Sequence, residues 1–538
     1  MPFHLPFLPR RALFVALVAA SFGLSVPQVG QAQVTSYKLA VAEALAKDDS
    51  IAAFYRARDF APIWTGASAQ DLARRQALFE ALAQAKSHGL PATRYGADGL
   101  IAMMGTVRNA QEQGEVEVAL TRAFVAYAHD IQTGILKPGD VVSGIKREVP
   151  LRDPALTLAS LMQNDPRAAI RALAPQSQEY ARLMKEKMLL ERKLTQGGWG
   201  PVVNSGKIEP GQSGPAVVAL RNRLIAMGYM GRSVSASYDP DLKAAVMQFQ
   251  GDHGLTADGV AGRDTLGQIN IGVEERLQSI LVAMERERWL NLPGGLGKRH
   301  IRVNLTEFNA KIIDDGKVTF ETRSVIGAVP ADRETPEFSD VMEYMVVNPS
   351  WYVPRSIVVK EYLPKLRDNP GAVGHLEITD SRGQSVNRAA GFGQYSASSF
   401  PYSMRQPPGP SNALGQVKFM FPNKYNIYLH DTPSKSLFNS EVRAYSHGCI
   451  RLGDPKDFAY ALLSRQTDDP EGVFQSRLRT GKESTISLET PVPVHLIYRT
   501  AFTSAKGRIN YRRDIYDRDA RIWAALSDAG VVLPTQGS

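Results

Sequence analysis

Cys449 and the residues around it carry the clearest chemical potential in this sequence. The run from Ser446 to Leu452 reads Ser-His-Gly-Cys-Ile-Arg-Leu, and a second histidine, His430, lies upstream at the end of a predicted strand. A free cysteine is only a few per cent thiolate at pH 7, so a nucleophilic role requires a base that takes its proton. His447 and His430 both qualify on chemistry, and their spacing leaves the choice open.

Gly448 and Arg451 extend this interpretation. A glycine before the nucleophile allows unusual backbone angles and a close approach of substrate. It would expose the backbone N–H groups of Gly448 and Cys449 as an oxyanion hole, and Arg451 can bind a carboxylate in a bidentate manner. The alternative is structural, with the cysteine packed as a small hydrophobic residue and His447 as a core histidine. The grouping of these residues around the only cysteine of the chain favours chemistry.

The composition limits the classes of protein. The chain has 538 residues, which predicts about two to four domains. Its net charge of +9 favours an anionic partner, and nucleic acid, anionic lipid and the bacterial wall all qualify. The basic residues are dispersed and no nucleic-acid motif is present, which argues against a nucleic-acid binder. With a single cysteine, the chain forms no intrachain disulfide.

The N-terminus has the order of a secretory signal. Arg10 and Arg11 precede an apolar stretch at 12–24, and small residues precede a cleavage point before Gln33. The apolar stretch is shorter than the roughly 20 residues that span a bilayer. We therefore expect a signal peptide over residues 1–32 and a periplasmic protein. An uncleaved signal that tethers the chain to the inner membrane is the alternative.

Two helical regions precede the candidate nucleophile. Residues 36–195 carry apolar residues at helical spacing and no catalytic constellation, which favours a scaffold. After a linker rich in glycine, proline and serine, residues 205–272 show helical patterns separated by turns. This second region resembles the three-helix peptidoglycan-binding module, through Gly228-Tyr229, Val246-x-x-Phe249-Gln250 and Asp258-Gly259-x-x-Gly262-x-x-Thr265-Leu266. The alternative is a helical spacer that binds nothing.

From about His300 the apolar pattern changes to a period near two, which predicts a mainly β domain. The turn Asp314-Asp315-Gly316 between two apolar segments indicates a hairpin. The segment from about 368 to 412 is rich in glycine, serine, proline and aromatic residues, as is typical of a functional lid. The predicted strands are 300–305, 310–313, 317–326, 341–347, 416–421, 426–430 and 492–500, and the predicted helices are 357–366 and 455–463.

His430 followed by Ser446-His447-Gly448-Cys449 resembles the signature of the L,D-transpeptidase catalytic domain of the YkuD type. One departure is Ile450-Arg451 after the cysteine, where many small relatives carry other residues. Together with the helical region and the binding module, the chain is similar to the large multidomain YcbB-like branch of this family. Further matching segments are Thr335-Pro336-x-Phe338-Ser339-Asp340, Asn348-Pro349-x-Trp351-x-Val353-Pro354 and Gln406-x-Pro408-Gly409-Pro410-x-Asn412-Ala413-Leu414-Gly415.

The resemblance implies a reaction. In the family a thiolate attacks the carbonyl that joins the diamino acid of a tetrapeptide stem to its terminal D-alanine, and D-alanine leaves. The side-chain amine of a neighbouring stem then resolves the acyl-enzyme, which gives a 3→3 cross-link. Carried onto this sequence, Cys449 is the nucleophile and His430 is the general base and acid. Acylation of Cys449 by carbapenems is also expected, and no metal or other cofactor is.

The resemblance assigns further residues by position. Supporting or oxyanion roles fall to His447, Gly448, Ser446 and Tyr428. Substrate-binding roles fall to Arg451, Trp351 and Asn412. The expected partner is peptidoglycan, with tetrapeptide stems as donor and acceptor, and other wall-synthesis enzymes are further candidate partners.

We therefore expect a multidomain α+β protein with a helical scaffold, a small three-helix peptidoglycan-binding domain and a mainly β catalytic domain that carries a capping insertion. The expected ranges are a signal peptide at 1–32, the scaffold at 33–196, the binding domain at 205–272, a linking helix at 273–300, the catalytic domain at 301–475 with its insertion at about 368–412, and a C-terminal β-hairpin and helix at 476–538.

Several competing functions use the same sequence features. An L,D-carboxypeptidase would use the same site with water as acceptor, and some family members use the lysine of an outer-membrane lipoprotein instead of a second stem. A catalytically inactive scaffold that only binds the wall is a different class, and the intact pair of His430 and Cys449 argues against it. A zinc peptidase with the same binding module would need clustered metal ligands, and the sequence has no HExxH pattern.

Overall fold

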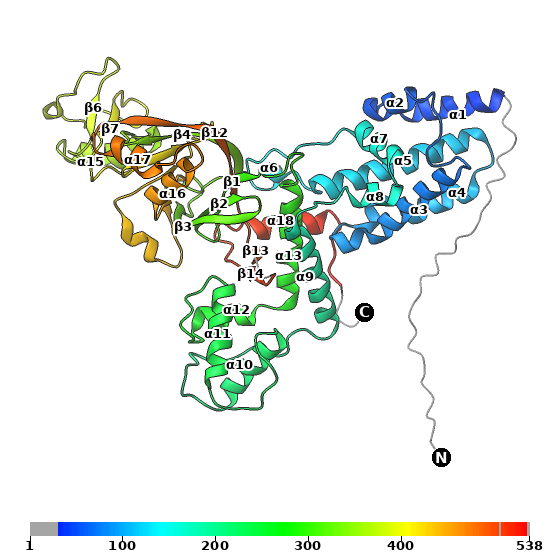
Figure 1. Ribbon diagram of the computed structural model, residues 1–538, viewed down its shortest axis with the longest axis horizontal. Coiled ribbons are helices and arrows are strands. Elements are labelled where there is room, and N and C mark those ends of the chain that lie inside the picture. The colour runs from blue at the N-terminus through cyan, green and yellow to red at the C-terminus, as the bar shows by residue number, and fades with distance from the viewer. Residues whose placement is uncertain (1–30, 505–506, 535–538) are drawn as a thin grey trace. The chain divides into compact units, whose positions relative to one another are not determined.

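The computed structural model of the protein describes residues 31–504 and 507–534. Nearly all of the predicted signal peptide therefore lies outside the described residues. The described residues divide into two compact units, one formed by 31–83, 95–127 and 153–170 and the other by 84–94, 128–152, 171–504 and 507–534. Within the described ranges, no helix is long and apolar enough to cross a membrane. The expected fold class is confirmed (Figure 1).

The first unit is helical, and its helices are α1 (Gln31–Ala44), α2 (Asp49–Arg56), α3 (Ala69–Gln84), α4 (Ala97–Thr106), α5 (Ala110–Thr133), α7 (Pro154–Gln163) and α8 (Pro166–Arg171). The loop between α2 and α3 is held by the fully buried Glu117 of α5. Its carboxylate accepts hydrogen bonds from the hydroxyl of Tyr55 and from the amides of Ile63 and Thr65, at 2.7 to 2.8 Å. A buried carboxylate is tolerated because so many donors surround it.

The second unit contains α6 (Pro138–Val141) and α9 (Gln178–Thr195), followed by the three helices of the small domain, α10 (Pro215–Ala226), α11 (Pro240–Asp252) and α12 (Arg263–Asn270). Leu220, Leu242, Val246 and Phe249 form much of the small domain's own core. The linking helix α13 (Val273–Trp289) packs against α9 and against the C-terminal helix α18 (Arg518–Asp528). In Figure 1, α13 and α18 lie beside the edge of the catalytic sheet.

The catalytic domain is built on a nine-stranded sheet in the order β10-β3-β11-β9-β8-β4-β12-β1-β2. Because β2 also pairs with β3, the sheet closes on itself. The turn between β2 and β3 has positive φ at Asp315 and Gly316, as a type I′ hairpin requires. The strands are β1 (Arg299–Asn304), β2 (Asn309–Asp314), β3 (Lys317–Gly327), β4 (Phe338–Val347), β8 (Val417–Met420), β9 (Leu429–His430), β10 (Ala444–Ser446), β11 (Ile450–Leu452) and β12 (Ser484–Ile497).

Most of these strands agree with the sequence-based expectation, but β9 is shorter than the predicted 426–430. Asn426 has φ of 56°, outside the β region, so pairing starts later. The core of the sheet contains Val303, Leu429 and Ile450 and is covered by α16 (Pro455–Leu463) and α17 (Pro470–Leu478).

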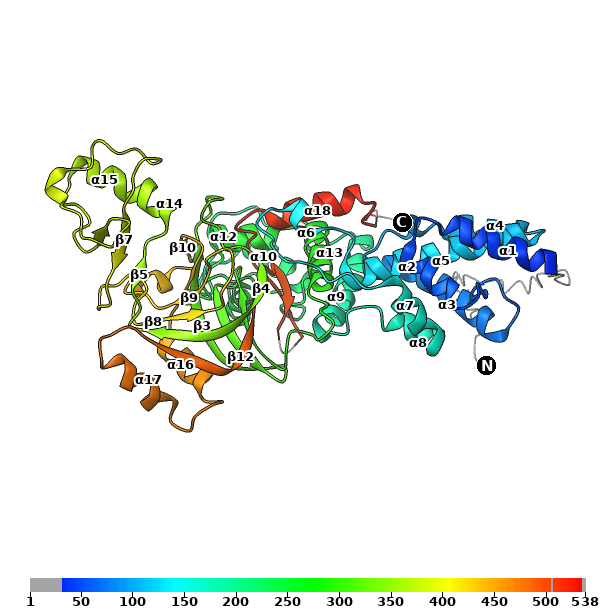
Figure 2. The same ribbon diagram turned by 90° about the horizontal axis from the view of Figure 1, so that it is seen from above.

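The capping insertion is larger than expected. It contains β5 (Trp351–Tyr352), α14 (Arg355–Ile357), a π-helical turn (Val358–Tyr362), α15 (Leu363–Asp368), β6 (Glu377–Thr379) and β7 (Ser403–Gln406). The strands pair in the order β5-β7-β6, and the helical segment packs on the same core, with Val358, Leu363, Leu366, Leu376, Ile378, Phe392, Phe400 and Met404. The insertion therefore begins near Trp351 rather than 368, because composition marks only its irregular part. Figure 2 shows it as a lobe projecting from the sheet.

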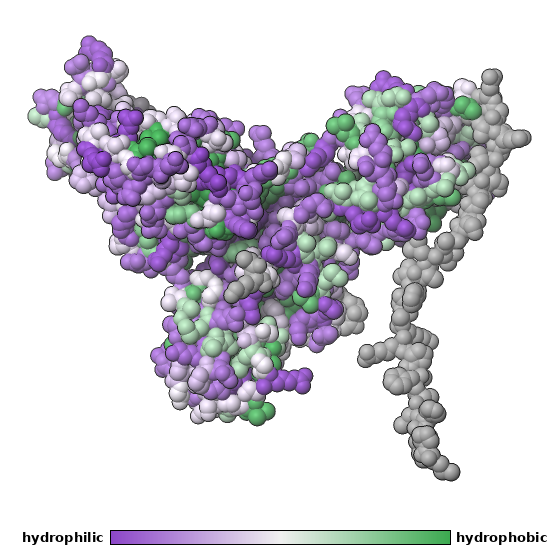
Figure 3. Space-filling model, viewed as in Figure 1, coloured by the Kyte–Doolittle hydropathy of each residue, from purple (hydrophilic) through white to green (hydrophobic). Residues whose placement is uncertain are grey.

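A C-terminal hairpin of β13 (Ala501–Thr503) and β14 (Ile509–Tyr511) leads to α18. This hairpin touches the small domain, since Arg508 pairs with Asp252 at 3.3 Å and His253 stacks on Tyr511. On the face of the catalytic domain visible in Figure 3, the surface is mainly hydrophilic.

Candidate active site

Cys449 lies immediately before β11, half-buried in the wall of a cavity of about 1050 Å³. The cavity is lined by the catalytic sheet on one side and by the capping insertion on the other. From the sheet come Tyr428, His430, Ser446, His447, Cys449 and Arg451, and from the insertion come Trp351, Tyr352, Glu361, Tyr362 and His375. The fold therefore gathers most of the predicted site residues in one place.

The register of two parallel strands explains this gathering. In the pairing of β9 with β11, Leu429 lies opposite Ile450 and His430 lies opposite Arg451. Alternate residues of a strand point to opposite faces. Leu429 and Ile450 are fully buried in the core, so His430 and Arg451 face the cavity. Cys449 and Tyr428, which precede these strands, line the same cavity.

His430 is held in one tautomer by its neighbour. Its Nδ1 lies 2.5 Å from the carbonyl oxygen of Asp431, and a carbonyl only accepts, so Nδ1 carries the hydrogen. This leaves the lone pair on Nε2, which is the atom a general base needs. The Asp431 carboxylate is fixed in turn by the amide of Gln416 at 2.8 Å and by Lys435 at 2.7 Å.

Burial sets the resting charges of the two candidate catalytic groups. It lowers the pKa of His430 to about 3, with the positive charge of Arg451 as the next cause. Burial likewise raises the pKa of the Cys449 thiol to about 11, although hydrogen bonds from Tyr428 and the charge of Arg451 oppose the rise. The thiol donates to the carbonyl of Asn426 at 3.5 Å. These shifts favour a neutral thiol and a neutral imidazole in the same cavity over a thiolate–imidazolium pair.

The backbone around the nucleophile differs from the expected oxyanion hole. The amide of Gly448 donates to Ser446 Oγ at 3.1 Å, and the same hydroxyl donates to the carbonyl of Cys449 at 2.5 Å. The Gly448 amide already donates within the loop, which argues against the predicted oxyanion role for it. Ser446 organises the loop through these two bonds, because its hydroxyl can accept and donate at once. Gly448 itself has φ of 108°, a conformation that glycine adopts without strain.

His447 contacts the capping insertion rather than the thiol. Its Nε2 lies 2.5 Å from the carboxylate of Glu361, in the π-helical turn, and Glu361 also pairs with Arg333 at 2.9 Å. Next to it, Lys360 pairs with Asp332 at 2.7 Å. Glu361 was not predicted from the sequence. The feature that draws attention to Glu361 is structural: it lies in a π-helical turn, and such turns are frequent at functional sites.

The three predicted substrate-binding residues have different environments. Arg451 lines the cavity with its Nε buried and without a hydrogen-bond partner, and none of the described carboxylates pairs with it. Trp351 also lines the cavity. Asn412 is fully buried and donates to the carbonyls of Gln406 and Pro407, at 3.2 and 2.8 Å. The expectation for Asn412 is wrong, because its amide side chain organises a turn.

Among the described residues, no group of three or more histidine, cysteine, aspartate or glutamate side chains could hold a metal ion.

Sequence models of three domain families match the chain. The model described as "L,D-transpeptidase catalytic domain" matches residues 298–494, "Putative peptidoglycan binding domain" matches 213–269, and "Scaffold domain" matches 49–186.

Two curated relatives and two solved structures are similar to parts of the chain. A "Putative L,D-transpeptidase" of Haemophilus influenzae is 33% identical over 224 residues, which are 41% of this chain and 45% of the relative. A "Zinc D-Ala-D-Ala carboxypeptidase" of Streptomyces albus G is 41% identical over 69 residues, 12% of this chain and 26% of the relative. The chain thus spans less than half the length of each relative.

The structures are L,D-transpeptidases of Xylanimonas cellulosilytica and Stackebrandtia nassauensis. Their sequence identities are 16% and 14%, each aligns with 55% of this chain, and the alignments cover 100% and 97% of those chains with TM-scores of 0.17 and 0.20.

Proposed function

The chain carries a catalytic domain of the L,D-transpeptidase family, as its motifs predict, and we propose that it forms 3→3 cross-links between peptidoglycan stems through a Cys449 acyl-enzyme. One observation supports this above all. The only thiol of the chain, an imidazole with a free Nε2 and a guanidinium without a partner line a single cavity. These are a nucleophile, a base and a carboxylate-binding group.

In the proposed acylation, Sγ of Cys449 attacks the carbonyl carbon between the diamino acid and the terminal D-alanine of a donor stem. The thiol proton passes to Nε2 of His430 as the carbon–sulfur bond forms. The depressed pKa of His430 and the raised pKa of Cys449 favour proton transfer together with attack rather than before it. The imidazolium then protonates the leaving nitrogen, the C–N bond breaks, and free D-alanine departs.

In the proposed second step, the side-chain amine of an acceptor stem attacks the thioester. His430 takes a proton from this amine and returns it to the sulfur, so that a new amide and the free thiol result. Arg451 binds a stem carboxylate, because a half-buried guanidinium without a partner is a strong site for an anion. The matched binding domain and catalytic domain indicate peptidoglycan as the partner.

The test is to incubate the mature protein with a disaccharide-tetrapeptide and to analyse the products by mass spectrometry. Dimers with a 3→3 bond together with free D-alanine are expected. Tripeptide monomers without dimers would identify an L,D-carboxypeptidase instead, and no turnover by a folded protein that binds sacculi would identify a wall-binding scaffold. Cys449→Ala should abolish turnover and carbapenem acylation, whereas Tyr445→Phe, an exposed neighbour outside the cavity, should retain both.

We further propose that the protein acts in the periplasm. The basis is the predicted signal at 1–32, and fractionation of cells that express the full chain tests it. Recovery of the protein in the cytoplasm would contradict this location and leave the proposed chemistry untouched.

A further inference from the structure

Thr335 lies in the loop between β3 and β4 and contacts the residue before the nucleophile. Its hydroxyl donates to the carbonyl oxygen of Gly448 at 2.7 Å and accepts the amide of Gly327 at 2.9 Å. The side chain is fully buried. A hydroxyl has only one hydrogen, so its donation is committed to Gly448.

This contact fixes the orientation of the peptide that joins Gly448 to Cys449. In a trans peptide the C=O and the N–H point in opposite directions. Because Thr335 binds the Gly448 carbonyl on the buried side, the amide of Cys449 is directed to the other side. A flip of this peptide would break the bond from Thr335 to the Gly448 carbonyl, so the hydroxyl opposes it.

Of the three consecutive backbone amides around the nucleophile, the outer two have hydrogen-bond partners and the middle one has none among the described residues. The amide of Gly448 donates to Ser446 Oγ at 3.1 Å, and the amide of Ile450 donates to the carbonyl of Tyr428 at 3.1 Å. In the described part of the chain, no acceptor takes the amide of Cys449. The middle amide is thus the one left for a ligand.

We propose that Thr335 is a positioning residue, which holds the Gly448–Cys449 peptide so that the Cys449 amide stabilises the oxyanion formed on the attacked carbonyl. The inference rests on the function proposed above and adds a residue to it. The amide acts on the reacting oxygen, and Thr335 acts only through the amide.

Thr335 is itself held by the C-terminal segment of the chain. Arg518 of α18 donates to the carbonyl of Thr335 at 2.8 Å. The hydroxyl of Tyr516 donates to the carbonyl of Gly327 at 2.6 Å and accepts the Thr335 amide at 3.4 Å. A Cβ added to Gly327 would lie 2.6 Å from the nitrogen of Thr335, so the two segments touch too closely for any side chain there.

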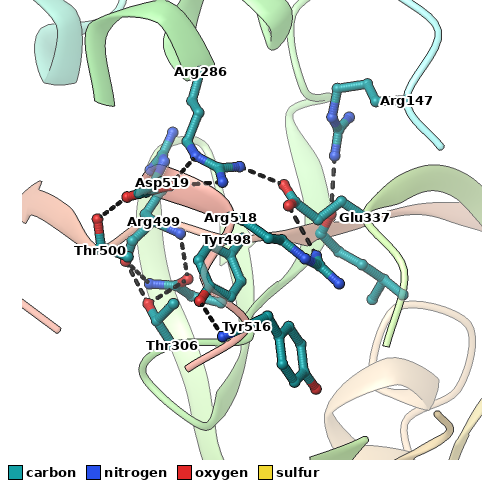
Figure 4. Close-up of polar contacts among 12 residues, drawn as sticks. Arg147, Arg286, Thr306, Glu337, Tyr498, Arg499, Thr500, Tyr516, Arg518 and Asp519 are labelled. Carbon is teal, nitrogen blue, oxygen red and sulfur yellow. Dashed lines mark hydrogen bonds and ion pairs between the residues drawn. The ribbon is translucent and has the colours of Figure 1, made fainter. Parts of the chain in front are cut away.

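Arg518 is anchored by a buried network of charges, which Figure 4 shows. Its guanidinium pairs with Glu337 and Glu334 at 2.9 Å each. The second oxygen of Glu337 accepts from Arg286 of α13 at 2.8 Å, and Arg286 also pairs with Asp519. Buried charged side chains with several partners keep their positions, because breaking one ion pair would leave a buried charge without its partner. The linking helix α13 and the C-terminal helix α18 therefore hold Thr335, and through it the Gly448–Cys449 peptide, in place.

The test compares two reactions of the same thiol. Alkylation of Cys449 by iodoacetamide develops no oxyanion, whereas acylation by a carbapenem does. Thr335→Val removes the hydroxyl at nearly constant volume, and Thr335→Ser keeps it. In Thr335→Val the acylation rate constant should fall by at least about 10-fold, with alkylation at the same pH changed less than about twofold. Thr335→Ser should react as the wild type in both assays.

Equal acylation of Thr335→Val and the wild type would overturn the inference, and so would an equal slowing of both reactions. If Thr335→Val fails to fold, Tyr516→Phe decides, because it removes only the hydroxyl that holds Gly327 and Thr335. A selective loss of acylation in Tyr516→Phe supports the inference, and unchanged acylation overturns it. If the wild type itself is alkylated but never acylated, the proposed function fails, and the inference fails with it.

Discussion

His430 and Arg451 lie directly opposite one another in the parallel strands β9 and β11. After burial, the charge of Arg451 is the second cause that lowers the pKa of His430 to about 3. A stem carboxylate that binds Arg451 would offset this charge, so the base would gain strength when substrate arrives. In this view the thiol stays weakly reactive until substrate binds, which would suit a lone cysteine in the periplasm proposed above.

Replacing Arg451 by glutamine tests this coupling. The pKa of His430 should rise but stay below 6.5, because burial remains as the larger cause. Loss of a charge-assisted bond of about 1.5–3 kcal/mol should lower kcat/KM by roughly 10- to 100-fold. NMR titration of labelled histidine and steady-state kinetics measure the two effects. Arg405→Gln, a change in the pair with Glu377 on the capping insertion, is the matched control. An unchanged pKa of His430 would contradict the coupling.

The raised pKa of Cys449 predicts the pH dependence of its alkylation. Since the thiol titrates near 11, the thiolate fraction should grow about 10-fold per pH unit between pH 7 and pH 10. The rate of iodoacetamide alkylation, followed by intact mass, should therefore rise through this range without a plateau. A plateau between pH 6 and pH 8 would instead indicate a preformed thiolate–imidazolium pair, and the neutral resting state would be wrong.

Gly415 and Asp431 provide a test of how the base is positioned. Gly415 has φ of 62°, and a Cβ on it would lie 2.3 Å from the carboxyl carbon of Asp431. Gly415→Ala should cost at least about 2 kcal/mol in urea unfolding, because strain and overlap add. Activity should fall as well, since Asp431 provides the carbonyl that binds His430. Gly409→Ala is the control, with no atom within 4 Å of the new Cβ. Equal stability of the two variants would refute the argument.

The sequence predicted the reacting side chains better than the residues that hold them in position. Cys449 stood out as the only cysteine of the chain. His430 was assigned as its base by the family resemblance, because the spacing alone left the choice between His430 and His447 open. Thr335 appeared only within a segment that resembles the family, without a predicted role, and Glu361 gave no signal. Their partners Gly448 and His447 are 113 and 86 positions away in sequence, and ordinary loop and helix residues reveal nothing about contacts at that distance.

Asn412 shows the opposite failure. An asparagine in a loop rich in proline and glycine suits a ligand site and a turn equally well, because its amide can donate and accept in both. Only its burial and its bonds to Gln406 and Pro407 separate the two uses. The start of the capping insertion was missed for a related reason, since pairing between β5 and β7 joins residues that composition does not connect.

The contact between His447 and Glu361 predicts the behaviour of the capping insertion. Glu361→Ala removes both this contact and the pair with Arg333. These part-exposed pairs contribute about 1 kcal/mol, so the amides of the π-helical turn should exchange roughly fivefold faster with deuterium. Glu377→Ala, in a pair elsewhere on the insertion, should leave this turn unchanged. Equal exchange in both variants would show that Glu361 does not hold the insertion.

His495 predicts a loss of stability in mild acid. Its Nε2 donates to the carbonyl of Leu296 at 2.9 Å, and its Nδ1 lies 2.8 Å from Ser339 Oγ, which also accepts from Arg147. Burial lowers the pKa of His495 to about 4, with the charge of Arg147 as a further cause. The unfolded chain, with a pKa near 6.5, therefore binds more protons between these values, and stability rises with pH there.

Between pH 7 and pH 5 this one residue should cost the folded state about 2 kcal/mol. Urea unfolding of the wild type and of His495→Asn at both pH values measures the difference. The variant loses the titrating group, so its stability should fall less on acidification even if it is less stable at pH 7. His375→Asn, at an exposed position, should keep the pH dependence of the wild type. If the free energy of unfolding falls by the same amount from pH 7 to pH 5 in His495→Asn as in the wild type, the acid-sensitive groups lie elsewhere in the protein.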